Sequence, residues 1–176
     1  MTTPPFDTPD SIPTARDIAI VSAQLGRPAR NVIGISARCV CGAPTVVATK
    51  PRLEDGTPFP TLYYLSSPAA TAAVSTLEAT GVMPELAELL VDDVRDAYLA
   101  AHEAYLADRN GIEFVEELDG ISAGGMPTRV KCLHALVAHS LSAGAGVNPI
   151  GDLALERATW SPDVCECVDY ELVGPA

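Results

Sequence analysis

The chain has 176 residues and a mass of 18.4 kDa, the size of one domain with at most a small appendage. It carries 23 acidic and 11 basic residues, a net charge of -12, and this balance argues against binding to nucleic acids or to anionic membrane surfaces. The chain has no apolar run of roughly 18 residues, as a membrane span requires, and residues 1–13 do not have the pattern of a secretory signal. We therefore expect a cytoplasmic protein without a membrane partner.

The predicted elements begin with a disordered lead over residues 1–13, rich in Pro and Thr. A helix is predicted over 14–25, because Thr14 and Asp17 have the spacing of a capping box and Gly26 follows the last turn. Short β-rich runs predict strands over 31–37, 45–49 and 61–65, the first two joined by a turn at 39–44. These strands predict a small antiparallel sheet.

Helices dominate the second half. Pro68 and Gly81 bracket a helix predicted over 68–79, and apolar residues three and four apart predict a long amphipathic helix over 84–109. A further helix is predicted over 127–142, followed by a short segment at 148–160 and an irregular, cysteine-bearing tail at 161–176. The pattern predicts one α+β domain over 14–160, with about three strands between residues 31 and 65 packed against several helices.

The five cysteines are the first candidate for a functional site. They form two close pairs, Cys39-x-Cys41 and Cys165-x-Cys167, and one single residue, Cys132. In a reducing compartment such thiols are free, catalytic or metal-bound, and zinc and iron–sulfur clusters usually take four thiolates. The two pairs would supply four ligands, as would one pair with Cys132 and a member of the other pair. We expect zinc, with an iron–sulfur cluster as the second choice.

Geometry decides which of these residues can share an ion. Residues two apart on a strand point to opposite faces, whereas at a turn, such as the one after Cys41, both can reach one ion. His134 follows Cys132 closely, but two positions on a regular helix are roughly 200° apart, so these side chains would face opposite sides. Neither residue needs to be a metal ligand. Cys132 could instead be a small buried hydrophobe, and His134 a hydrogen-bonded core histidine.

A second candidate site is cationic. If the hairpin packs near the start of the helix at 127–142, five basic residues converge there and could bind a small anionic or phosphorylated ligand at the helix N-terminus. The alternative is that they pair with the acidic helix face. The residues are Arg38, Lys50, Arg52, Arg129 and Lys131.

Several segments form a distinctive set: Arg38-Cys39 followed by Gly42 and Pro44, the run Gly56-Thr57-Pro58-Phe59-Pro60-Thr61, and Lys131-Cys132-Leu133-His134-Ala135 followed by Asn148-Pro149-Ile150-Gly151. Over roughly residues 15–155 the chain resembles an uncharacterised, mainly actinobacterial family catalogued as domain of unknown function 501. The resemblance implies a small cytoplasmic protein but no particular reaction. The family pattern includes Cys39, Cys132 and His134, whereas Cys41 is an addition to it. The resemblance therefore favours Cys39 and Cys132 as metal ligands over a site made of the two cysteine pairs.

Three functions therefore follow as hypotheses, in this order. The first is a thiolate metal-binding protein with a structural or redox role, in which Cys39 and Cys132 are the core ligands and Cys165, Cys167, Cys41 or His134 completes the set. The second is an enzyme or sensor for a small anionic ligand, with a cysteine nucleophile or redox thiol, His134 as base and the cations as a clamp. The third is a scaffold that binds a protein partner through the acidic helix. The sequence leaves open whether the protein is an enzyme.

Overall fold

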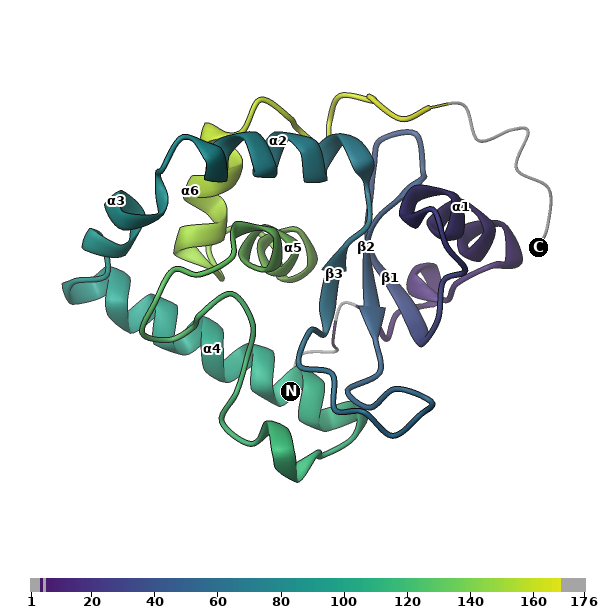
Figure 1. Ribbon diagram of the computed structural model, residues 1–176, viewed down its shortest axis with the longest axis horizontal. Coiled ribbons are helices and arrows are strands. Elements are labelled where there is room, and N and C mark those ends of the chain that lie inside the picture. The colour runs from purple at the N-terminus through teal and green to yellow at the C-terminus, as the bar shows by residue number, and fades with distance from the viewer. Residues whose placement is uncertain (1–3, 5, 169–176) are drawn as a thin grey trace.

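The computed structural model describes residue 4 and residues 6–168, and this part of the chain is an α+β domain in which helices cover both faces of a three-stranded sheet (Figure 1). The sheet is antiparallel with the order β1–β2–β3, formed by Val32–Arg38, Pro44–Thr49 and Tyr63–Leu65. The helices are α1 (Ala15–Leu25), α2 (Pro68–Ala79), α3 (Met83–Glu88), α4 (Asp92–Ile112), α5 (Leu133–Ala143) and α6 (Pro149–Arg157), with short 3-10 turns at Pro9–Ser11 and Glu116–Leu118. The predicted fold class is confirmed.

The central strand β2 is buried on both faces, and all six of its residues are buried. Val46 and Ala48 point toward α5 and belong to the main core, whereas Val47 points toward α1 and packs with Val21 and Ile35. This alternation follows from the period of two of a strand. Within the described residues, no helix combines the length and apolar character that a membrane crossing needs.

The predicted caps of the first two helices are confirmed. Thr14 accepts a hydrogen bond from the backbone N–H of Asp17, whose carboxylate accepts the N–H of Thr14 in return, and Gly26 ends α1 in a left-handed conformation. Helix α2 has the predicted bounds, with Ser67 as N-cap and Pro68 in the first turn. Local capping chemistry decides these boundaries, so the sequence is enough to locate them.

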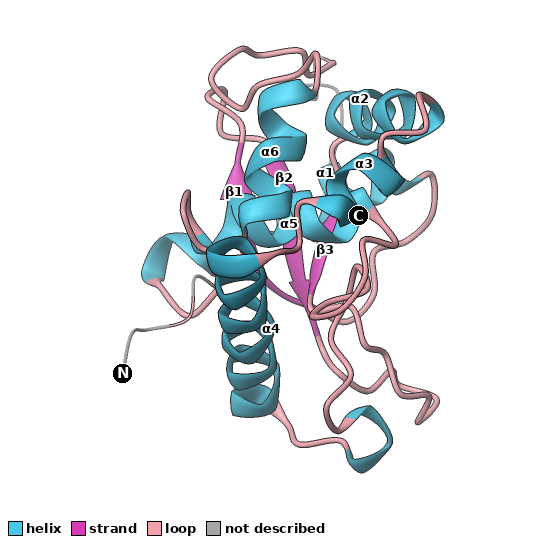
Figure 2. Cartoon of the chain, turned by 90° about the vertical axis from the view of Figure 1, so that its left-hand side faces the viewer, coloured by secondary structure: helices cyan, strands magenta, loops and turns pink. Residues whose placement is uncertain are grey.

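The long helix predicted over 84–109 is two helices. Helix α3 ends at Glu88, the chain turns at residues 89–91, and α4 begins at Asp92, whose φ of 45° is left-handed. Leu86 lies before the corner and Val94 after it, and both pack against the main core. The apolar period therefore continues across the corner, and no Gly or Pro marks the break. Helix α4 runs along one side of the molecule (Figure 2).

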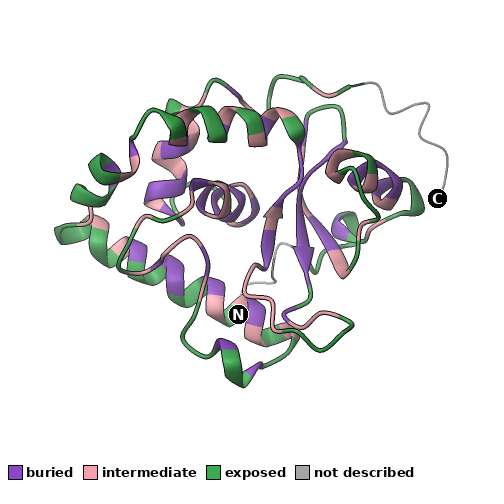
Figure 3. Ribbon diagram, in the orientation of Figure 1, coloured by how far each residue is buried: buried purple, intermediate pink, exposed green. Residues whose placement is uncertain are grey.

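The helix predicted over 127–142 begins later, at Leu133. Cys132 is its N-cap, with an extended backbone at φ -149° and ψ 109°. The preceding residues form a loop that folds back on Gly124, whose carbonyl accepts the N–H of Lys131 at 2.7 Å. Helix α5 has no exposed residue, in contrast to the one-sided burial of α4 (Figure 3).

The N-terminal lead departs from the expected disorder in its described part. Phe6 packs against Tyr63, with ring centroids 6.1 Å apart, and its backbone and Cβ cover Gly34 of β1 so closely that a Cβ there would clash. A 3-10 turn follows at Pro9–Ser11. In the tail, the described residues 161–168 are irregular as expected, and residues 169–176 lie outside the described part.

A buried histidine lies at the centre of the main core. His139 stacks on Tyr63 at 5.7 Å and contacts the edge of Tyr105 at 5.3 Å, and its Nδ1 accepts a hydrogen bond from the Asn148 amide at 3.2 Å. Its Nε2 is buried and has no hydrogen-bond partner among the described residues. Burial lowers the pKa of His139 to about 4, against a weaker opposing effect of Asp152.

We expect this histidine to make the fold acid-sensitive. Between pH 6.5 and about 4 the unfolded chain binds a proton at His139 that the folded chain rejects, so stability falls as the pH falls, by about 3 kcal/mol in total. His139→Phe keeps an aromatic ring beside Tyr63 and cannot titrate. Urea unfolding from pH 7 to 4 should show a stability loss in the variant smaller by about 3 kcal/mol, and parallel curves for the two proteins would contradict the assignment.

Candidate metal centre

Four of the five cysteines converge in space. The sulfurs of Cys39, Cys41, Cys165 and Cys167 all lie within 4.8 Å of one another. Four sulfurs around a tetrahedral zinc would be about 3.8 Å apart, given a Zn–S bond of about 2.3 Å. A four-cysteine cluster of these dimensions could bind a metal ion. The structure thus brings the two predicted pairs together.

The turn between β1 and β2 positions the first pair. Cys39 donates its N–H to Ala43 at 2.9 Å and accepts the N–H of Gly42 at 2.7 Å, and Gly42 has a φ of 87° that suits glycine. The chain therefore reverses within four residues, and the sulfurs of Cys39 and Cys41 reach the same point. The backbone N–H groups of Cys41 and Ala43 face the sulfurs of Cys39 and Cys41 respectively.

The tail brings the second pair to this turn. Residues 158–168 run from the end of α6 across the molecule to the β1–β2 turn (Figure 1). There the carbonyl of Pro162 accepts the N–H of Val40 at 3.1 Å, and Cys167 packs against Ile20 and Ala43. Cys39 is buried, Cys167 is half-buried, and Cys41 and Cys165 are exposed. The cluster therefore lies at the surface, where the tail contacts the hairpin.

The four thiols do not titrate alike. The N–H of Ala43 and the neighbouring sulfurs lower the pKa of Cys41 to about 7, against the effect of burial. Burial, followed by the proximity of Cys41 and Cys39, raises the pKa of Cys167 well above 9. Burial likewise raises the pKa of Cys39. Four adjacent thiolates repel one another, and a divalent cation among them relieves that repulsion.

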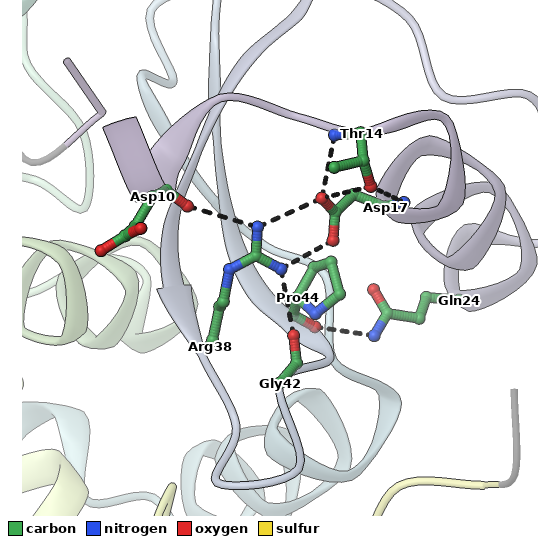
Figure 4. A network of polar contacts seen from close by, with 7 residues as sticks. All are labelled: Asp10, Thr14, Asp17, Gln24, Arg38, Gly42 and Pro44. Atoms are coloured by element: carbon green, nitrogen blue, oxygen red, sulfur yellow. Dashed lines mark hydrogen bonds and ion pairs between the residues drawn. The ribbon is translucent and has the colours of Figure 1, made fainter. Parts of the chain in front are cut away.

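An ion pair supports the same turn from α1 (Figure 4). The guanidinium of Arg38 contacts both carboxylate oxygens of Asp17, at 2.6 and 3.1 Å, and donates to the carbonyl of Gly42 at 3.0 Å. Burial acts to raise the pKa of Asp17, but the hydrogen bonds from Arg38 and Thr14 outweigh it and hold this pKa below 3.8. Arg38 thus links the helix α1 to the turn that carries Cys39 and Cys41.

Cys132 lies apart from the four-cysteine cluster. Its sulfur is grouped with Glu78 of α2 and His134 of α5, and the three ligand atoms lie within 4.8 Å of one another. The expected pairing of Cys39 with Cys132 as core ligands is therefore replaced by two separate groups. Sequence reasoning missed Glu78 as a ligand, because nothing in the sequence places it beside Cys132, which lies 54 residues further along the chain.

The expectation that Cys132 and His134 face opposite sides is wrong. The sulfur of Cys132 lies 3.9 Å from Nδ1 of His134. Opposite orientations require a regular helix through both residues, but Cys132 is the N-cap and has an extended backbone. The hydrogen bond with His134 lowers the pKa of Cys132, and the same contact raises the pKa of His134.

The five cations of the second candidate site occupy different places. Arg38 and Lys50 lie at opposite ends of the hairpin, because Arg38 pairs with Pro44 whereas the N–H of Lys50 bonds to Asn31 at the start of β1. Arg52 contacts the acidic residue Glu117 at 2.8 Å, but Glu117 lies beyond the predicted helix face, in the 3-10 turn at Glu116–Leu118. The loop before α5 carries the other two with exposed side chains, Arg129 and Lys131. The structure does not bring Arg38 and Lys50 together into one anion clamp.

Comparison with known proteins assigns the chain to a family. No curated protein and no solved structure matches the chain at a significant level. A family match covers residues 35–156, more than half of the chain. It includes Cys39, Cys41, Glu78, Cys132 and His134, whereas Cys165 and Cys167 lie beyond it. The chain therefore belongs to the family described as protein of unknown function (DUF501), as its sequence motifs predicted.

Proposed function

We propose that the protein is a zinc-binding protein in which Cys39, Cys41, Cys165 and Cys167 hold one structural zinc ion. The observation that carries the proposal is the convergence of four sulfurs within 4.8 Å from two distant parts of the chain. Four protein ligands complete a tetrahedral shell and leave no position for a substrate, as in structural rather than catalytic zinc sites.

The surroundings of the sulfurs fit this role. The N–H groups of Cys41 and Ala43 point at sulfur, and such donors stabilise thiolates over thiols. A zinc ion with four thiolates has a net charge of -2, which these donors and the surface position offset. The ion would fasten the tail to the hairpin, where Val40 and Pro162 already share a backbone hydrogen bond.

The test is the metal content of the purified protein and of a variant without the tail ligands. Cys165→Ser/Cys167→Ser should lose one equivalent of zinc per chain, measured by ICP-MS. The matched control is Val164→Ser/Val168→Ser, which changes two exposed residues of the same tail and should keep the metal. In the cobalt-substituted protein, strong sulfur-to-cobalt charge-transfer absorption should report several thiolates around one ion and should disappear in the cysteine variant.

Three results would overturn the proposal. One is full zinc content in Cys165→Ser/Cys167→Ser, because the tail would then supply no ligand. The second is protein isolated under reducing conditions that contains no metal and takes up none. The third is iron with inorganic sulfide and a brown colour that depend on these cysteines, which would assign an iron–sulfur cluster instead.

A further inference from the structure

We propose that Glu78, Cys132 and His134 form a second metal site, which binds a divalent transition ion such as zinc through three protein ligands. The three side chains supply one carboxylate oxygen, one sulfur and one imidazole nitrogen, all within 4.8 Å of one another. Three protein ligands leave the fourth tetrahedral position to water, which is the arrangement of zinc sites that exchange a ligand. This site is distinct from the four-cysteine centre and does not depend on it.

The separations between ligand atoms suit a shared ion. Oε1 of Glu78 lies 3.3 Å from Nδ1 of His134, and Sγ of Cys132 lies 3.9 Å from the same nitrogen. Metal bonds of about 2.0–2.3 Å at tetrahedral angles would place oxygen and sulfur about 3.3 and 3.6 Å from the nitrogen. Both separations from the nitrogen are therefore within a few tenths of an ångström of those in a tetrahedral site, and the oxygen and sulfur lie within 4.8 Å of each other.

The other ring nitrogen of His134 fixes which nitrogen can bind the ion. Nε2 lies 3.3 Å from the backbone carbonyl of Thr71 and 3.0 Å from the hydroxyl of Ser75. A carbonyl oxygen only accepts hydrogen bonds, so Nε2 is the protonated nitrogen of the neutral ring. This leaves the Nδ1 lone pair directed at Cys132 and Glu78. Metal-binding histidines commonly donate their second N–H to a backbone carbonyl in this way.

The same geometry disfavours a nucleophilic triad. In a triad, the histidine contacts the nucleophile through one ring nitrogen and the orienting carboxylate through the other. Here Cys132 and Glu78 both approach Nδ1, and the carboxylate is absent from Nε2. When the ring is neutral, two anionic groups and the nitrogen lone pair converge on one point, which is the arrangement of a coordination shell for a divalent ion.

The start of α5 holds the three ligands in place. The backbone N–H of Leu133 donates to Oε1 of Glu78 at 2.7 Å, and the N–H of Ala135 faces the sulfur of Cys132. These are free N–H groups of the first helical turn, which favour negative charge. With a divalent ion, one thiolate and one carboxylate, the site is neutral; the thiol proton of Cys132 passes to solvent on binding. Glu78 and His134 are partly exposed, so solvent reaches the site.

Helix α2 separates the two sites. A small cavity beside its N-cap, Ser67, is also lined by Cys167 of the first site. Glu78 lies eleven residues further along the same helix, which corresponds to about 16 Å at 1.5 Å per residue. One ion cannot span both groups, so the chain should bind two ions at independent positions.

The test is zinc titration by calorimetry of metal-free protein under reducing conditions. Cys165→Ser/Cys167→Ser isolates the second site and should bind one equivalent. Adding Cys132→Ser or Glu78→Gln should weaken that binding by about 100-fold or more. Both changes are structurally mild, because serine is a good N-cap and glutamine keeps an oxygen for the N–H of Leu133. In the cobalt form, one sulfur should give roughly one quarter of the charge-transfer intensity of a four-sulfur site.

Thr76→Ala in the same background is the matched control. Thr76 is exposed on the same helix α2 and its hydroxyl donates to the carbonyl of Ala72, so this variant leaves the three ligands and the partners of Nε2 in place and should bind one equivalent as before. Absence of zinc binding in Cys165→Ser/Cys167→Ser, with circular dichroism showing a folded protein, would overturn the second site and leave the first intact. Zinc binding that survives Cys132→Ser and Glu78→Gln would also overturn it. If only the first site is lost in Cys165→Ser/Cys167→Ser, the protein should still bind one equivalent of zinc, and this binding should depend on Cys132.

Discussion

Removal of the metal from the four-cysteine centre should lower the melting temperature by about 8–16 °C. At a free zinc concentration a thousandfold above Kd, binding to the folded state alone stabilises it by about 4 kcal/mol. For a chain of this length, each kcal/mol corresponds to about 2–4 °C. Thermal unfolding of a Cys132→Ser protein, with and without chelator, isolates this centre because the second site is already disabled.

The destabilisation should be confined at first to the contact between tail and hairpin. Cys41 and Cys165 are more than 120 residues apart in sequence, so the ion closes a very long loop. Without it, the tail is held by the Val40–Pro162 hydrogen bond and by the packing of Cys167 on Ile20 and Ala43. Hydrogen exchange and proteolysis should therefore increase over residues 39–43 and 161–168 before they increase in α5.

A chelator that leaves the melting temperature of Cys132→Ser unchanged, although it removes the zinc, would contradict a structural role. The variant Cys165→Ser/Cys167→Ser/Cys132→Ser is the internal control. It contains neither complete site, so chelator should not change its unfolding. Acidification should act in the same direction as chelator on the intact centre, because protons compete with zinc for thiolates.

Local chemistry made much of the fold predictable. The capping box of Thr14 and Asp17 and the start of α2 at Pro68 are predicted from a few neighbouring residues, and both are confirmed. The position of Cys39 and Cys41 at a turn likewise predicted that both side chains could bind the same ion. These features need no knowledge of distant contacts, because each is decided by hydrogen bonds between sequence neighbours.

The parts that could not be predicted depend on long-range packing. The break between α3 and α4 preserves the apolar period, so periodicity alone cannot reveal it. The start of α5 depends on a loop folding back to Gly124, and a shift of that start by six residues reversed the geometry of Cys132 and His134. Glu78 contacts the start of α5 only because α2 packs beside it. Arg38 forms an ion pair with Asp17 of α1, a contact between elements that the sequence alone does not reveal.

The loop that leads to Cys132 depends on a buried cation, and its removal should be strongly destabilising. Arg109 is fully buried in α4, and its guanidinium donates to the carbonyls of Leu118 and Ile121. Burial lowers the pKa of Arg109, with Tyr105 and Asp119 opposing it, but an arginine stays charged in proteins. This cation therefore fastens the start of the loop over residues 113–132 to the long helix.

We expect Arg109→Ala to reduce the free energy of unfolding by about 3–5 kcal/mol, because it leaves a cavity and removes the charged donor that the carbonyls of Leu118 and Ile121 share. Arg109→Met fills most of the volume and should cost less, which separates packing from hydrogen bonding. Arg95→Ala, an exposed arginine of the same helix, should change stability by no more than about 0.5 kcal/mol. Urea unfolding measures all three. If Arg109→Ala is as stable as Arg95→Ala, the loop is held by its apolar contacts alone, and the position of Cys132 does not depend on this cation.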